Sequence, residues 1–93
     1  MAIDRHLYRH LFLCRIRARR VAEQGGRCCY CRRPCTKTGP TRPTIEHRKA
    51  KMDGGSDDPA NLAAACRHCN ERRGAQMNHA RQLAAKGREG PRA

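Results

Sequence analysis

Apolar residues at the start of the chain recur at the spacing of a helix. From residue 3 to residue 23 they follow one another at steps of three or four, which gathers them on one helical face. The members of this face are Ile3, Leu7, Leu11, Cys14, Ala18 and Val21. Gly25 and Gly26 then end the segment. The pattern predicts an amphipathic helix over residues 3–23, with Cys14 as one of its core residues.

Two short strands and a second helix are predicted further along the chain. The residues TIEH at 44–47 predict one strand, and the apolar residues at 62–65 predict another, although alanine is a poor strand former. Between them lies a loop at 53–59 that is rich in glycine and aspartate. Residues 70–86 predict a helix that is interrupted or kinked at Gly74.

The length and composition fit one small domain with a weak core. The chain has 93 residues, no tryptophan, one phenylalanine and two tyrosines, so its small core needs an additional source of stability. No apolar run reaches the roughly 18 residues that a membrane helix needs, and none suits a signal peptide. We expect a basic amphipathic helix at 1–25, a folded domain at 26–86 and a flexible tail at 87–93.

The charge is strongly positive, with 21 Lys and Arg against 8 Asp and Glu and a net charge of +13. Such a charge implies a polyanionic partner, of which nucleic acid is the commonest. The arginines of the first helix form either an ordinary solvated face or a face that binds phosphates. Because aromatic residues are so few, a stacking platform for single strands is not expected, which favours a double-stranded partner.

Seven cysteines indicate a metal site, because an odd number cannot be fully paired in disulfides and nothing marks the chain for export. Two CxxC motifs at 28–31 and 66–69 would form a closed tetrahedral site for structural zinc. Its ligands would be Cys28, Cys31, Cys66 and Cys69. Cys29 and Cys35 are alternatives for the first motif, and His68 for the second, but the identical spacing favours the four cysteines.

A histidine next to a carboxylate lies between the two cysteine motifs. Neutral His47 can act as a general base, because imidazole titrates at about 6.5. Glu46 can bind a hard cation. The pair alone is a weak signal, since a histidine beside an acid is usually structural or exposed. Asn61 and Asn70 strengthen it, because the first follows the glycine-rich loop and the second follows the last cysteine.

Together these residues resemble an HNH nuclease, in the branch with two CxxC motifs that is common in phage and bacterial proteins. The resemblance rests on TIEH at 44–47, GGSDDPANL at 54–62 and CRHCNERR at 66–73, and it extends over residues 26–75. It implies a small α+β fold with a ββα-metal core, in which two antiparallel strands and a helix surround a catalytic divalent ion. The four-cysteine zinc site and the preceding N-terminal helix would be added to this core.

The resemblance implies a role for each motif residue. His47 would be the general base that activates water, and Asn61 would hold the loop and orient His47. Glu46 and Asn70 would ligate the catalytic ion, for which Mg²⁺, Mn²⁺ or Ni²⁺ is expected. The chain departs from the family at Glu46, where aspartate is commoner, and after His47, where Arg48 replaces an apolar residue. These departures bear on the metal preference more than on the activity.

We therefore expect a metal-dependent endonuclease that hydrolyses DNA with low sequence specificity, in the cytoplasm of a bacterial host cell. Basic side chains would contact the DNA phosphates without reading the bases. The expected contacts are Arg48, Lys49, Lys51, Arg72 and Arg73. Packaging, restriction, homing and toxin nucleases would share this core, and a terminase or a restriction partner is compatible with it.

Two other interpretations fit parts of the sequence. A zinc-stapled DNA-binding module without hydrolysis would need the cysteines and the charge, but it would leave His47, Asn61 and Asn70 unexplained. A zinc adaptor for protein partners, such as a RING-like module, usually needs ligands for a second ion and need not be this basic. The nuclease interpretation uses all of these features.

Overall fold

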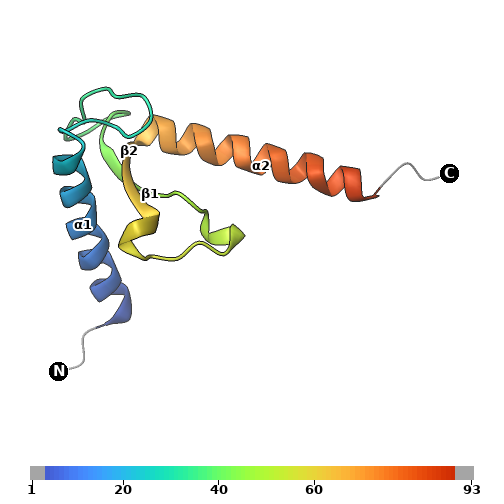
Figure 1. The fold of residues 1–93 in the computed structure, drawn as a ribbon, viewed down its shortest axis with the longest axis horizontal. Coiled ribbons are helices and arrows are strands. Elements are labelled where there is room, and N and C mark those ends of the chain that lie inside the picture. Colours follow the sequence, from blue (N-terminus) through green and yellow to red (C-terminus); the bar gives the residue numbers. More distant parts are fainter. Residues whose placement is uncertain (1–3, 90–93) are drawn as a thin grey trace.

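The predicted small α+β fold is confirmed by the computed structural model, which describes residues 4–89 and side chains as far as Lys86. Two long helices flank a two-stranded hairpin, and they leave it in different directions (Figure 1). None of the described helices is long and apolar enough to cross a membrane. The elements are α1 (Arg5–Glu23), β1 (Pro43–His47), the 3₁₀ turns η1 (Lys51–Asp53) and η2 (Pro59–Asn61), β2 (Leu62–Cys66) and α2 (Arg67–Glu89).

The hairpin is antiparallel and forms the centre of the molecule. Ile45 pairs with Ala64 and Glu46 with Ala63, so each strand is one residue longer than the sequence predicts. Every residue of β2 is buried, whereas only Glu46 is buried on β1. The three alanines of β2 are poor strand formers, but their small side chains let the elements around the strand approach closely.

Helix α1 packs on the hairpin through a different face from the predicted one. Ile16 is its buried residue, at 6% exposure, whereas Leu7 and Leu11 on the predicted apolar face are 53% and 54% exposed. Polar side chains on the Ile16 side explain the difference. Arg20 donates to the carbonyl oxygens of Leu62 at 3.0 Å and of Pro59 at 2.7 Å. These bonds satisfy backbone acceptors that an apolar face would have left unpaired.

Gln24 fixes the end of α1 to the outer edge of β2. Its amide nitrogen donates to the carbonyl oxygen of Ala64 at 2.9 Å, and the N–H of Ala64 donates to its amide oxygen at 3.1 Å. The amide therefore pairs with β2 as a neighbouring strand would. The orientation of α1 follows from these polar contacts as much as from its apolar residues.

Helix α2 directly follows β2 and runs without interruption through Gly74, so the predicted interruption there is wrong. A Cβ at Gly74 would meet no neighbouring atom within 4 Å, and one exposed glycine costs only about 1 kcal/mol relative to alanine. A long helix tolerates that cost. The helix continues to Glu89, and residues 90–93 of the predicted flexible tail lie outside the described residues.

Candidate functional site

The two CxxC motifs meet at one end of the hairpin. The first motif lies in a tight turn closed by an isolated bridge between Arg27 and Pro34, where Arg32 adopts a positive φ of 64°. The second spans the end of β2 and the first turn of α2. The four sulfur atoms lie within 4.8 Å of one another, as a single metal site requires. The residues of this cysteine cluster are Cys28, Cys31, Cys66 and Cys69.

Backbone N–H groups of the cysteine cluster donate to sulfur, an arrangement that favours thiolates. The N–H groups of Tyr30 and Cys66 lie 3.4 Å and 3.3 Å from the sulfur of Cys28. Burial opposes ionisation of Cys28, but the N–H groups of Cys66, Cys31 and Tyr30, in that order, outweigh it and lower the pKa of Cys28 to about 6. Burial and the neighbouring thiols raise the pKa of Cys69 to about 12. Four thiolates this close need a cation, and the cluster is consistent with structural zinc.

The other candidate ligands lie outside this cluster. Cys29 and Cys35 are half-buried, and burial raises the pKa of both thiols. His68 is exposed on the first turn of α2. The structure therefore brings together the four cysteines with identical spacing.

Glu46 and His47 at the end of β1 line a cleft together with Asn70 of α2. The cleft has a volume of about 340 Å³. Glu46 is 6% exposed, and burial raises the pKa of its carboxyl group. Its Oε1 lies 3.8 Å from Nε of Arg73. Its Oε2 is buried without a hydrogen-bond partner among the described residues.

Asn70 has its side chain fixed by two hydrogen bonds to β1. Its amide nitrogen donates to Oγ1 of Thr44 at 2.9 Å and to the carbonyl oxygen of Ile45 at 3.0 Å. The carbonyl can only accept, so the nitrogen must face it and the amide oxygen Oδ1 must point away. Asn70 therefore offers an oxygen of fixed direction beside the cleft.

Asn61 joins the two ends of the loop that follows β1. Its Oδ1 accepts from the N–H of Lys49 at 2.8 Å, and its amide nitrogen donates to the carbonyl oxygens of Lys49 at 3.1 Å and Ser56 at 2.8 Å. The backbone folds so tightly here that a Cβ at Gly55 would lie 1.7 Å from the carbonyl oxygen of Lys49. Only glycine fits at that position.

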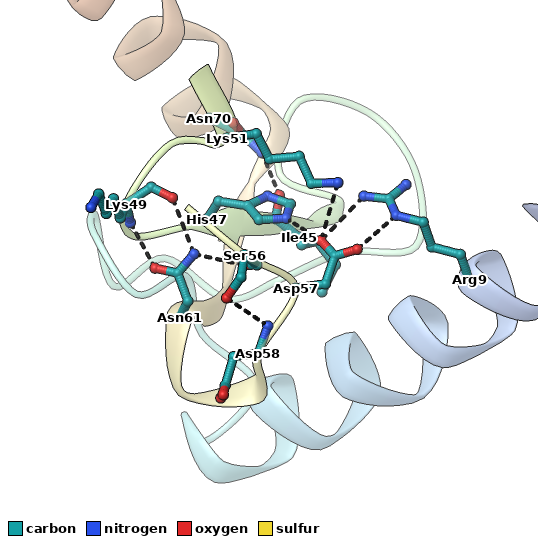
Figure 2. Close-up of polar contacts among 10 residues, drawn as sticks. All are labelled: Arg9, Ile45, His47, Lys49, Lys51, Ser56, Asp57, Asp58, Asn61 and Asn70. Carbon is teal, nitrogen blue, oxygen red and sulfur yellow. Dashed lines mark hydrogen bonds and ion pairs between the residues drawn. The ribbon is translucent and has the colours of Figure 1, made fainter. Parts of the chain in front are cut away.

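Asp57 contacts His47, and the sequence did not predict it as a site residue. Figure 2 shows its carboxylate among the side chains of His47, Lys51 and Arg9. Oδ1 of Asp57 lies 2.8 Å from Nε2 of His47, and Arg9 pairs with both carboxylate oxygens. Hydrogen bonds from Arg9 first and His47 second hold the pKa of Asp57 below its ordinary value. The sequence feature that could have indicated Asp57 is the acidic loop that contains it, within a strongly basic chain.

The predicted phosphate contacts differ in their surroundings. Arg73 lies over the ring of Tyr30, with its guanidinium carbon 5.3 Å from the ring centre, and it donates to the carbonyl oxygen of Arg48 at 2.9 Å. It therefore forms part of the cleft wall rather than a freely projecting contact. Lys51 lies 3.4 Å from Asp57. The side chains that project from the surface are Arg48, Lys49 and Arg72, together with Lys51.

A comparison with family models finds a match to this chain. The model described as HNH endonuclease matches residues 28–76, which is more than half of the 93 residues. The matched region contains the four-cysteine cluster, both strands and most of the residues that line the cleft, among them Glu46, His47 and Asn70. No significant match was found among curated proteins or among solved structures.

Proposed function

Because this chain belongs to the HNH endonuclease family, whose members are nucleases that act on DNA, we propose that it hydrolyses DNA phosphodiester bonds in the cleft beside β1. In this proposal His47 is the general base. Asn61 holds the loop that follows β1, and Glu46 and Asn70 hold a divalent ion.

The observation that carries the proposal is the unpartnered Oε2 of Glu46 in the wall of the cleft. A buried carboxylate oxygen without a donor costs free energy unless a positive group joins it. Arg73 approaches the other oxygen and so offsets only part of this cost. With Oδ1 of Asn70, Oε2 supplies the oxygen ligands that Mg²⁺ and Mn²⁺ prefer, and Ni²⁺ is a further candidate.

The side chains around the cleft would divide the remaining tasks of hydrolysis. Neutral His47 takes the proton from the attacking water. A bound divalent ion would stabilise negative charge on the phosphoryl and leaving oxygens. The exposed basic side chains near the cleft would hold the phosphates of double-stranded DNA. Because phosphate contacts carry no base information, the expected sequence specificity is low.

The test is cleavage of supercoiled plasmid by the zinc-loaded protein with added Mg²⁺, Mn²⁺ or Ni²⁺. The blank omits the added metal, since a chelator would also remove the structural zinc. We expect metal-dependent nicking or linearisation, and a loss of about 100-fold or more in His47→Ala, because the base is removed. His79→Ala is the matched control, since His79 is exposed on α2. Its rate should equal that of the wild type.

Two outcomes would contradict the proposal. If His47→Ala cut at the wild-type rate, His47 would not be the base. If the protein shifted the DNA on a gel but left it intact with every metal, the chain would act as a zinc-stapled DNA-binding module.

A further inference from the structure

We propose that Asp57 is a positioning residue for His47 and that Arg9 of α1 holds Asp57 in place, so that the N-terminal helix belongs to the nuclease site. The inference rests on the proposed role of His47 as the general base. Asp57 lies in the loop between β1 and β2. Arg9 lies outside residues 28–76, which match the family model.

The contact with Asp57 selects one tautomer of the His47 ring. Nε2 of His47 lies 2.8 Å from Oδ1 of Asp57. An ionised carboxylate only accepts hydrogen bonds, so Nε2 carries the proton and donates it to this bond. The lone pair of the neutral ring is then on Nδ1, which remains to accept a proton from water. His47 lines the cleft and Asp57 does not, so the carboxylate holds the ring from outside the cleft.

Asp57 is itself held by cations from two other elements. Nε of Arg9 lies 2.7 Å from Oδ2, and Nη2 of Arg9 lies 3.3 Å from Oδ1. Nζ of Lys51 lies 3.4 Å from Oδ1. The planar guanidinium of Arg9 therefore engages both oxygens, which fixes the carboxylate in direction as well as in place. Figure 2 shows Arg9 reaching Asp57 from α1.

The loop does not need the carboxylate of Asp57 for its own closure. Its neighbour Asp58 caps η2 by accepting from the N–H of Ala60 at 2.9 Å, and Asn61 ties the two ends of the loop together. Of the partners of the Asp57 carboxylate in the described residues, Arg9 lies on α1 and His47 on β1, and only the side chain of Lys51 belongs to the same loop. Its contacts therefore serve the histidine rather than the loop backbone.

The first test compares Asp57→Ala with Asp58→Asn in the zinc-loaded, full-length protein. At saturating duplex DNA, the single-turnover rate of Asp57→Ala should fall roughly 10–100-fold, as activity does when a metal-bound histidine loses its orienting partner, while DNA affinity stays unchanged. Asp58→Asn keeps a good helix cap and should keep the wild-type rate. A wild-type rate in Asp57→Ala would overturn the proposal, and so would a loss confined to DNA affinity.

Asp57→Asn keeps the proposal testable if the alanine variant does not fold. The amide keeps the shape and one acceptor oxygen, so the fold should persist and the rate should lie between those of the wild type and Asp57→Ala. A folded Asp57→Asn protein that cuts no slower than the wild type would contradict a role for the carboxylate charge.

The role of α1 in the site is tested by comparing Arg9→Gln with Arg19→Gln. Both substitutions remove one positive charge from α1, but Arg19 is exposed and lies on another side of the helix. We expect a several-fold lower single-turnover rate in Arg9→Gln and no change in Arg19→Gln. Equal losses would show that only the charge of the helix matters, and would remove Arg9 from the site.

The tautomer is measured without DNA, by ¹⁵N NMR of the imidazole rings of the zinc-loaded protein at a pH where they are neutral. His47→Gln assigns the His47 signals. We expect the Nε2–H tautomer in the wild type and a mixture of tautomers in Asp57→Ala. An Nδ1–H ring in the wild type would overturn the proposal even if the protein cuts DNA. The expected tautomer in a protein without cleavage would support the contact and contradict only the nuclease function.

Discussion

The two ends of the hairpin are stabilised in different ways. At one end Pro43 pairs with Cys66, and the chain closes on four sulfur atoms that lie within 4.8 Å of one another. At the other end His47 pairs with Leu62, and the following loop is held by polar side chains, chiefly Asn61. One end uses a metal-type cluster, and the other uses hydrogen bonds and ion pairs.

This difference separates the parts that hold the fold from the parts that can do chemistry. A structural zinc site supplies folding free energy directly, which a chain with so few large apolar residues needs. The opposite end can then carry a buried carboxylate with an unpartnered oxygen, although such a group destabilises the folded state. Substitutions at the cysteine end should therefore destabilise the fold, whereas substitutions at the cleft end should lower activity without loss of stability.

The largest effect is expected at the cysteine end, from Cys66→Ser. Zinc binding contributes on the order of 10–16 kcal/mol in small zinc domains, which rivals the whole stability of a typical domain. The variant should lose both bound zinc and its circular dichroism signal for folded helix. Cys14→Ser is the control, since Cys14 lies on α1 outside the cluster. A folded Cys66→Ser protein that retains zinc would refute the ligand assignment.

At the cleft end, Glu46→Gln should abolish activity and leave the fold intact. We expect cleavage to fall on the order of 100-fold or more, because the charged ligand of the proposed ion is lost. Because burial raises the pKa of Glu46, the folded state binds this proton more tightly than the unfolded state does. Its ionisation therefore costs stability as the pH rises, and the neutral amide avoids that cost.

The measurement for Glu46→Gln is a thermal melt at neutral pH beside a plasmid-cleavage assay. The melting temperature should equal or exceed that of the wild type. A melting temperature lower by several degrees would mean that the cleft end also supports the fold, and the contrast between the two ends would fail.

Effects on stability without loss of the metal sites are expected between the two ends, where α1 covers β2. Ile16→Ala should lower the free energy of unfolding by about 2–5 kcal/mol, as buried isoleucines usually do. Leu11→Ala should change it by less than about 0.5 kcal/mol, because Leu11 is 54% exposed. Urea denaturation of the zinc-loaded variants measures both values. Equal losses would show that α1 packs on the hairpin through the apolar face that the sequence predicts.

The sequence predicts the cysteine end well, because its information is local. Two identical CxxC spacings determine which sulfur atoms can meet, and the structure brings those four together. Both strands were predicted to within one residue at an end, since Pro43 precedes the first predicted segment and Cys66 ends the short apolar run of the second. The roles of His47, Asn61, Glu46 and Asn70 stay predictions, although three of these residues line one cleft.

The features that the sequence did not predict depend on polar contacts between distant segments. Periodicity counts only apolar residues, so it could not show that Arg20 and Gln24 would set the packed face of α1. The place of Asp57 in the site could not be predicted for a similar reason, because its partner Arg9 lies 48 residues away. An ion pair over that distance leaves no periodic trace in the sequence.

The amide of Gln24 also has a consequence for how the hairpin meets other molecules. An exposed strand edge can recruit a strand from another chain, which leads to domain swapping or aggregation. At Ala64 both backbone groups of that edge are already taken, by Gln24 and by the N–H of Cys29. A foreign strand would have to displace α1 before it could pair with β2, so one glutamine protects the sheet from intermolecular growth along this edge.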